Sequence, residues 1–447
     1  MTLSNLLHLL LHVISMLYQT NAFSLQMYPI DSPHLQILPK HFTMKERHHF
    51  LRDISLSRAF LYDNNRNAKL GLNSIHAPLS NIQKGYFVTK FTIGDPDSGL
   101  SPIVLLDITA DLTWIQCSTC NPCFNLNRTF SVETSESYVR LNPTDLRCSP
   151  KMTFKGSCGF NVSLGNSRSE GYIGADTISF DDISGFFPNI AFGCGVRNTG
   201  IFFGNDTGNV IAGVYGLGIG PRSMITQLEP QIKGKFTYCI RPTNKTSTIF
   251  FGDDAHISGS EPVQRIAMVP EARYHLRLAG ITVKGKRLII EPSIFQLDDQ
   301  NYTSGFFIDP SAPYTVLSNT AYNKVKEKIV QHFSELKMEP LPINKTINTF
   351  DLCYGNSPDK SNRYNYPTMA FNFLKSGGNS GEVNLILNPK NIFGDLVIGN
   401  NTGFCFQMLP TPDQRDGPSI LGAYQQRNFQ FLFDINAKSL SFVPKNC

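Results

Sequence analysis

The chain has 447 residues, of which 41% are hydrophobic and 17% charged, so it is long and apolar enough for two domains with separate cores. Its 40 basic and 35 acidic residues give a formal net charge of +5 at pH 7. Residues 1–80 hold 7 basic and 4 acidic residues, so the remainder carries only +2 (33 minus 31). This weak, scattered charge argues against a nucleic acid as partner.

Residues 1–22 have the features of a secretory signal peptide, with a short apolar run over 6–17 and a small residue, Ala22, for cleavage. The alternative, a membrane span, needs about 20 consecutive apolar residues, and neither this run nor any later one reaches that length. We therefore expect a secreted protein with no membrane segment after signal removal. The apoplast or cell wall is the expected location, with the vacuole as the alternative.

Residues 23–80 differ from the rest of the chain because they are basic and rich in histidine, with a cluster of charges and histidines over 45–53. This composition predicts a partly helical prosegment. An N-terminal extension with no inhibitory role is the alternative, and the residues alone leave it open.

From residue 85 onward the pattern is all-β, because short apolar runs alternate with clusters of Gly, Asn, Asp and Pro. An apolar strand over 103–106 leads into Asp107, and a second over 306–308 leads into Asp309. The repeat predicts two lobes, 81–262 and 263–447, with one acid from each at their junction. A helix is expected over 319–336, where apolar residues fall at helical spacing.

Two facing carboxylates have a definite chemistry. At a separation of about 3 Å they cannot both ionise, so they share one proton, and one then acts as base toward a water while the other donates to a carbonyl oxygen. Neither a metal nor another cofactor is needed. A lone Asp after a strand is more often a turn or cap residue, but the second copy in a matching context favours the pair.

The ten cysteines are even in number and follow a secretion signal, so we expect all of them to form disulfides. The spacing of the first three would also suit zinc or an iron–sulfur cluster, but nearby histidines are lacking. Cys353 and Cys405 are the expected pair, because both lie in the strand-rich part of the second lobe. The other pairings remain open among Cys117, Cys120, Cys123, Cys148, Cys158, Cys194, Cys239 and Cys447.

Seven Asn-x-Ser/Thr triplets agree with a secretory route and a glycosylated surface. They begin at Asn127, Asn161, Asn205, Asn244, Asn301, Asn344 and Asn400.

Six motifs in order resemble those of pepsin-like aspartic proteases, specifically the secreted plant nepenthesin-type branch. They occupy 107–117, 192–195, 216–223, 236–239, 350–353 and 420–429, and the resemblance covers roughly 84–447. It implies an all-β, bilobal pepsin-like fold with a cleft between related lobes, and catalysis by Asp107 and Asp309. An extended peptide or protein substrate would bind in the cleft of a monomer, beside Leu164 of the hairpin (flap) over 158–171 and beside Thr109 and Ser311.

The two acidic loops depart from the family pattern. The family has Asp-Thr-Gly-Ser and Asp-Ser-Gly-Thr, whereas this chain has Asp-Ile-Thr-Ala from 107 and Asp-Pro-Ser-Ala from 309. Thr109 and Ser311 therefore replace glycines, and Leu164 replaces the usual flap tyrosine. The hydroxyls that cross between the loops and those that flank each acid are expected to be lost at four positions, Ile108, Ala110, Pro310 and Ala312.

These departures leave two functions open. The paired acids favour an acid endopeptidase, slowed by its altered loops. The missing glycines and hydroxyls favour an inactive peptide-binding or inhibitor protein on the same fold, similar to the plant xylanase inhibitors. A glycoprotein whose cleft has no function is a third alternative.

Overall fold

The computed structural model describes residues 22–32, 35, 37–38, 42–70, 85–95, 99–148, 152–164, 167–180, 186–200, 210–242, 245–269, 273–297, 304–342, 349–355, 365–377, 381–398, 401–412 and 416–447. Apart from Ala22, the expected signal peptide lies outside these residues. Within them, no helix combines the length and the apolar character that crossing a membrane requires.

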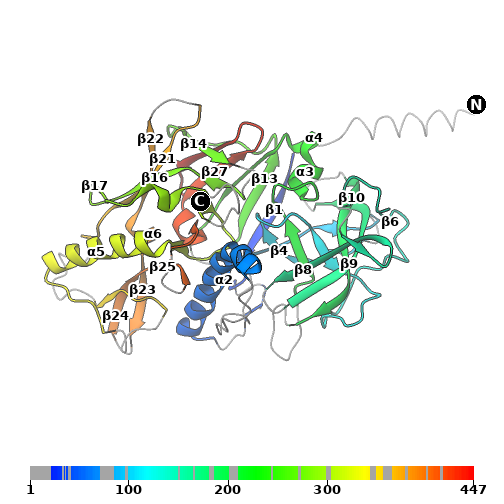
Figure 1. The fold of residues 1–447 in the computed structure, drawn as a ribbon, viewed down its shortest axis with the longest axis horizontal. Helices are drawn as coiled ribbons and strands as arrows, with labels where there is room; N and C mark the ends of the chain where they lie inside the picture. Colours follow the sequence, from blue (N-terminus) through cyan, green and yellow to red (C-terminus); the bar gives the residue numbers. More distant parts are fainter. Residues whose placement is uncertain are drawn as a thin grey trace, which may run out of the picture.

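The chain folds into two β-rich lobes, as predicted from the alternating apolar runs (Figure 1). The first lobe is built mainly from β2 (Phe87–Lys90), β3 (Thr92–Ile93), β4 (Ile103–Asp107), β5 (Trp114–Gln116), β6 (Val139–Arg140), β7 (Thr153–Phe154), β8 (Ser157–Leu164), β9 (Ser167–Ser179), β10 (Phe186–Thr199) and β11 (Gly213–Gly216).

The second lobe holds a comparable set and two small separate sheets, β17-β16-β21-β22 and β20-β24-β23. Its strands are β15 (His275–Leu276), β16 (Leu278–Val283), β17 (Lys286–Arg287), β18 (Phe306–Ile308), β19 (Thr315–Leu317), β20 (Cys353–Gly355), β21 (Met369–Leu374), β22 (Glu382–Leu387), β23 (Phe393–Ile398), β24 (Asn401–Phe406), β25 (Met408–Pro410) and β26 (Ser419–Leu421).

A run of paired strands joins the lobes, in the order β1-β13-β12-β27-β28-β14. These are β1 (Ala22–Pro29), β12 (Lys235–Cys239), β13 (Ser247–Gly252), β14 (Gln264–Val269), β27 (Phe429–Asp434) and β28 (Ser439–Pro444). Phe236 and Phe433 stack across this layer with ring centroids 4.3 Å apart, and both rings are buried. The predicted lobe boundary at 262/263 falls between β13 and β14.

Two long helices among the described residues lie outside the sheets. α5 (Asn319–Glu335) matches the predicted helix and buries Ala321, Tyr322, Val325, Ile329 and Phe333. α2 (Met44–Leu70) lies between the two lobes, where it contacts β19 (Figure 1). The other helices in the described part of the chain are short: α3 (Met224–Gln227), α4 (Glu229–Ile232), η3 (Pro292–Phe295), α6 (Pro389–Ile392) and α7 (Ala423–Gln426).

Candidate active site

The two lobes present Asp107 and Asp309 in equivalent settings. β4 ends at Asp107, and β11 runs parallel to it with Gly216 opposite that carboxylate residue. In the second lobe β18 precedes Asp309, and β26 runs parallel to it with Leu421 opposite Ile308. The strands β4 and β18 are almost fully buried, as expected for apolar runs paired within a parallel arrangement.

A neighbouring backbone segment packs closely against each acidic loop and is hydrogen-bonded to it. The amide of Gly216 donates to the hydroxyl of Thr113 at 2.9 Å, and the amide of Gly422 donates to that of Thr315 at 2.9 Å. A Cβ at Gly422 would lie 2.3 Å from the carbonyl carbon of Tyr314, so a larger residue would displace the loop. These glycine-containing segments therefore pass directly beside the two acids.

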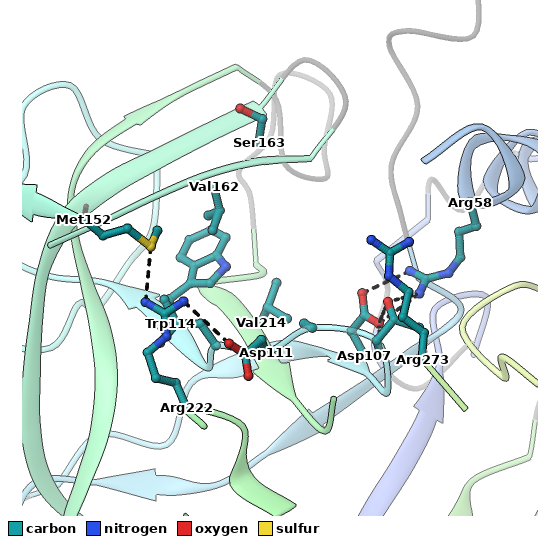
Figure 2. Close-up of a pocket in the computed structure, with 13 residues that line it drawn as sticks. Arg58, Asp107, Asp111, Trp114, Met152, Val162, Ser163, Val214, Arg222 and Arg273 are labelled. Carbon is teal, nitrogen blue, oxygen red and sulfur yellow. Dashed lines mark hydrogen bonds and ion pairs between the residues drawn. The ribbon is translucent and has the colours of Figure 1, made fainter. Parts of the chain in front are cut away.

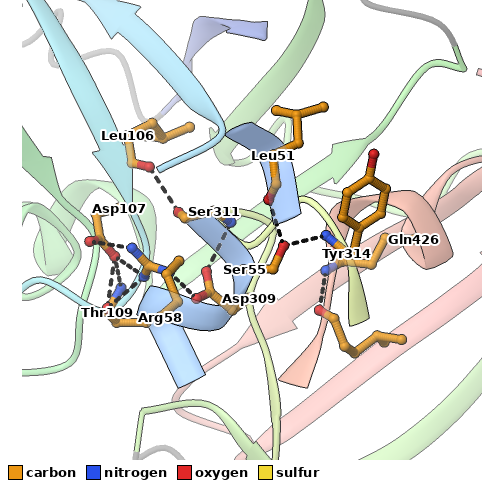
Figure 3. A network of polar contacts seen from close by, with 11 residues as sticks. Leu51, Ser55, Arg58, Leu106, Asp107, Thr109, Asp309, Ser311, Tyr314 and Gln426 are labelled. Carbon is orange, nitrogen blue, oxygen red and sulfur yellow. Dashed lines mark hydrogen bonds and ion pairs between the residues drawn. The ribbon is translucent and has the colours of Figure 1, made fainter. Parts of the chain in front are cut away.

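One guanidinium bridges the two acids (Figure 3). Arg58 donates from Nε to Oδ2 of Asp309 at 2.5 Å, from Nη1 to Oδ2 of Asp107 at 3.1 Å, and from Nη2 to Oδ1 of Asp107 at 2.9 Å. Its side chain is only 2% exposed. Because one planar group contacts both carboxylates, the structure brings Asp107 and Asp309 together at the lobe junction, as predicted.

The helix α2 delivers this arginine from the expected prosegment. Its buried positions include Leu51, Ile54, Ser55 and Arg58, a helical stripe that points to the lobes. Ser55 donates from Oγ to the carbonyl oxygen of Leu51 at 3.0 Å and accepts from the amide of Tyr314 at 2.9 Å. The helix is therefore hydrogen-bonded to the second acidic loop as well as ion-paired.

Earlier in α2, His48 makes a second contact with the second lobe. Nδ1 of His48 is 2.6 Å from the hydroxyl of the buried Tyr314. Nearby, Arg47 forms an ion pair with Asp31 at 2.6 Å. Segments before and within α2 are thus tied to each other and to the second lobe.

In the first acidic loop, the hydroxyl of Thr109 replaces the hydroxyl that is missing at Ala110. Thr109 donates both its amide and its hydroxyl hydrogen to Oδ1 of Asp107, each at 2.8 Å. The same hydroxyl accepts from Nη2 of Arg58 at 3.0 Å. The hydroxyl donor that Ala110 lacks is therefore supplied to Asp107 by the preceding residue.

In the second loop the expected loss of the cross-loop hydroxyl proved wrong. Ser311 donates its amide to Oδ1 of Asp309 at 2.9 Å, and its hydroxyl reaches across to the carbonyl oxygen of Leu106 at 3.0 Å. The prediction failed because it considered only Ile108 and Pro310, whereas the glycine position also faces the opposite loop. Ile108 is 1% exposed and belongs to the apolar core.

The environment separates the two carboxyls. Burial alone would raise the pKa of Asp107, but the charge and hydrogen bonds of Arg58, with the two Thr109 donors, hold it below its ordinary value. Burial raises the pKa of Asp309, and the charge of Asp107 adds to this, while Arg58 and Ser311 oppose it. The pair therefore favours an ionised Asp107 beside an Asp309 that retains its proton more readily.

A pocket of about 370 Å³ opens beside Asp107 (Figure 2). Its wall is formed by apolar side chains, including Trp114 and Val214, and by Val162 of β8. Charged residues lie at both ends, and they are Arg58, Asp107, Asp111, Arg222 and Arg273. The space can receive a side chain of an extended peptide.

Comparison with known proteins agrees with this geometry. The family models described as Xylanase inhibitor N-terminal and Xylanase inhibitor C-terminal match residues 87–253 and 273–444. Aspartic proteinases nepenthesin-1 and nepenthesin-2 of Nepenthes gracilis are 30% and 31% identical over 375 and 374 residues, in each case covering 81% of this chain and 78% of the relative.

The chain belongs to the plant pepsin-like aspartic protease family. Two solved structures share the pepsin-like fold at 17% identity: EDGP, with a TM-score of 0.63, and basic 7S globulin from soybean, with 0.60. They cover 80% of this chain and 91% and 93% of their own chains, respectively.

The flap of a pepsin-like protein corresponds to the hairpin of β8 and β9, in which Leu164 pairs with Ser167. The side chain of Leu164 lies outside the described residues, so its contact with a substrate stays a prediction. Val162 and Ser163 of the same strand line the pocket. The hairpin therefore lines the pocket beside Asp107, and its role as a flap stays a prediction.

All ten cysteines are paired, as predicted, and the expected pair Cys353–Cys405 is confirmed. The cysteines considered for a metal site are all in disulfides. The pairs are Cys117–Cys194, Cys120–Cys123, Cys148–Cys158, Cys239–Cys447 and Cys353–Cys405. Within the described ranges, no cluster of three or more His, Cys, Asp or Glu could hold a metal ion.

Two of the seven predicted glycosylation sites are described. Asn127 and Asn161 are exposed, and Oδ1 of Asn161 accepts from Nε of Arg168 at 3.0 Å. The other five, at Asn205, Asn244, Asn301, Asn344 and Asn400, lie outside the described residues.

The sequence interpretation missed Arg58. A signal was present, because Arg58 falls at the same helical face as Leu51 and Ile54, where a charged residue needs a buried partner. The two carboxylates that supply this partner are distant in sequence, and only the fold brings them to it.

Proposed function

We propose that the chain is the latent form of a secreted aspartic endopeptidase that binds an extended peptide between its lobes. The observation that carries this proposal is the bridge from Arg58 to both acids. A guanidinium between two carboxylates occupies the position where the water and the substrate carbonyl must lie. The prosegment 23–80 therefore acts as an inhibitor that must leave before catalysis.

Once Arg58 has left, the two carboxyls share one proton. The carboxylate of Asp107 removes a proton from water, whose oxygen forms a bond to the peptide carbonyl carbon, while Asp309 donates its proton to the carbonyl oxygen. The resulting diol collapses as its C–N bond breaks, the nitrogen takes the proton from Asp107, and a diol hydroxyl returns its proton to Asp309. The two Thr109 donors remain on Asp107 after Arg58 has left and support Asp107 as the base, while the complete burial of Asp309 supports it as the acid.

The altered residues of the two acidic loops support a lower catalytic rate than that of family members with the usual loops. Asp107 keeps two donors from Thr109, whereas Asp309 accepts from the Ser311 amide and is followed by Pro310 and Ala312, which carry no hydroxyl. A misplacement of about 1 Å at such a site costs on the order of a hundredfold in rate. The proposed destination is the apoplast or cell wall, or the vacuole, and the proposed state is a glycosylated monomer. The disulfides and the plant relatives support a secretory route.

The second candidate is an inactive peptide-binding or inhibitor protein. It is favoured by the apolar residues at Ile108, Ala110 and Ala312, and by the family model named for xylanase inhibitors. Under this candidate the cleft binds a peptide or a protein loop without cutting it.

The test is hydrolysis of a peptide mixture by the full chain at pH 3 to 6, with Asp107→Asn and Asp309→Asn as controls. Cleavage that both variants abolish supports the enzyme. No cleavage after verified release of the prosegment, together with inhibition of a xylanase, would support the inhibitor instead.

A further inference from the structure

The pocket beside Asp107 ends at an arginine that is largely, but not fully, buried. Arg222 has a side chain only 13% exposed, and it lies between Met152 and Asp111 at the end of the pocket farther from Asp107 (Figure 2). The wall between the two ends is apolar and includes Trp114 and Val214. A side chain that enters from the Asp107 end would thus pass apolar atoms before it reached Arg222.

The contacts of this guanidinium are long. Its Nη1 lies 3.6 Å from Sδ of Met152, a weak acceptor, and its Nη2 lies 3.6 Å from Oδ2 of Asp111. A normal N–H···O hydrogen bond spans about 2.7 to 3.2 Å. Among the described residues, the guanidinium therefore has no oxygen at normal hydrogen-bond distance, although it carries five N–H donors. Buried donors of this kind are usually satisfied, which points to an acceptor from a ligand.

We propose that this pocket binds a glutamate side chain of the peptide, with its carboxylate on Arg222. The methylenes would pack on Trp114 and Val214, and the two carboxylate oxygens would accept paired hydrogen bonds from the planar guanidinium. The proposal rests on the proposed function only in placing this glutamate next to the scissile bond. Binding itself requires no catalysis.

The neighbouring Asp111 does not exclude a second carboxylate. Burial raises the pKa of Asp111, and the charge of Arg222 offsets this only in part. In acidic solution Asp111 can therefore take up a proton and share it with the incoming carboxylate. An apolar side chain, in contrast, would cover Arg222 and supply no acceptor, and a lysine would meet a like charge.

A second cation adds to the positive potential. Arg273 lines the same pocket, at the end near Asp107 (Figure 2). Its backbone and that of Tyr274 have positive φ values of 58° and 56°, a conformation that non-glycine residues rarely adopt. The hydroxyl of Tyr274 donates to the carbonyl oxygen of Leu217 at 2.7 Å and holds this turn against the first lobe.

The chain provides its own probe, because Trp114 is the single tryptophan and lines the pocket. A recognition site for a specific protease would be inserted between residues 71 and 84 of the full chain, and the chain would be cut there. The N-terminal segment would not be removed from the sample. The cut protein would then be titrated with peptide at pH 5.5. Three tryptophan-free peptides would differ at one position, as Glu, Gln or Leu. Tryptophan fluorescence gives Kd, and product release gives kcat/KM.

We expect the Glu peptide to bind at least about tenfold more tightly than the Leu peptide, with Gln between them. At pH 3.5 the preference should shrink, because the glutamate becomes protonated. Arg222→Met should remove the preference, and Arg222→Lys should retain part of it. Arg197→Met serves as the matched control, because Arg197 is 59% exposed and pairs with Glu170.

Equal or weaker binding of the Glu peptide by the unaltered protein would overturn the proposal, whatever the variants do. Selective binding without hydrolysis would overturn the proposed function and leave this pocket assignment standing. Hydrolysis with a preference for leucine would overturn this pocket assignment and leave the proposed function standing.

Discussion

The hydroxyl of Ser311 donates to the backbone carbonyl oxygen of Leu106 at 3.0 Å, and so joins the second acidic loop to the strand that carries the first acid. Ser311 is 1% exposed, and its amide also holds Asp309. A residue that replaces a glycine of the family pattern thus connects the two lobes at the site.

We predict that Ser311→Ala destabilises the protein by about 1 kcal/mol, because one buried hydrogen bond is lost and the Leu106 oxygen is left without this donor. Urea unfolding of the full chain measures the change. Ser163→Ala, at an exposed position of β8, should stay within about 0.5 kcal/mol of the parent. If the two variants lose the same free energy of unfolding, the hydrogen bond between the loops makes no measurable contribution to stability.

Thr109 should set the acid limb of the pH profile. Thr109→Val removes one donor to Asp107 and keeps the shape of the side chain, so the pKa of Asp107 should rise. The acid limb of kcat/KM should then move to higher pH, whereas Thr109→Ser should leave it in place. A return to the family glycine, Thr109→Gly, should behave like the valine variant. An increase in rate with glycine would show that the hydroxyl hinders catalysis.

Removal of Arg58 should release the latent state at a cost in stability. Arg58→Met leaves two buried carboxylates without their cation, and we expect a loss of about 3 to 5 kcal/mol at pH 7. The folded-state pKa of Asp107 is lowered, so its contribution is present above the ordinary pKa and lost as pH falls through the folded value. The difference between the variant and the parent should therefore shrink below about pH 4.

Arg52→Met, on the same helix and 34% exposed, is the control for the loss of a long side chain. Unfolding at several pH values and access of a peptide to the cleft are the measurements. If both variants differ from the parent by the same free energy of unfolding, and this difference does not change with pH, the ion-pair bridge from Arg58 to the two acids is contradicted.

His48 should make the docking of α2 depend on pH. Burial, with the charges of Arg47, Arg427 and His49, lowers the pKa of His48 to about 4 from 6.5. A depressed pKa means that the docked state favours the neutral ring, so docking is fully stable above pH 6.5 and weakens as pH falls toward 4. The shift corresponds to up to about 3 kcal/mol.

Hydrogen exchange of α2 across this pH range measures the effect. His48→Gln should flatten the pH dependence between 6.5 and 4, because glutamine does not titrate. His256→Gln, at an exposed position, should leave it unchanged. A parent protein whose α2 protection is constant between these pH values would refute the role of His48.

The sequence predicted the parts of the fold that depend on local pattern. The buried strands before Asp107 and Asp309 and the helix over 319–335 follow from apolar spacing alone. The role of Arg58 does not, because a helix stripe shows that a residue is buried but not which residues receive it. The Ser311–Leu106 contact was missed for a similar reason: substitution within a loop moved a hydroxyl to a neighbouring residue, and only coordinates show which oxygen it reaches.

The strand β1 has a consequence for processing. It pairs with β13 through six residue pairs, from Ala22–Gly252 to Met27–Ser247, at the edge of the layer that joins the lobes. A cut after α2 severs the covalent link but leaves these backbone hydrogen bonds intact. If β1 then departed, the edge of β13 would be open and ready to pair with another strand. Processing therefore yields either two chains that migrate together under native conditions and show two N-termini, or a shortened chain prone to adopt a substitute strand.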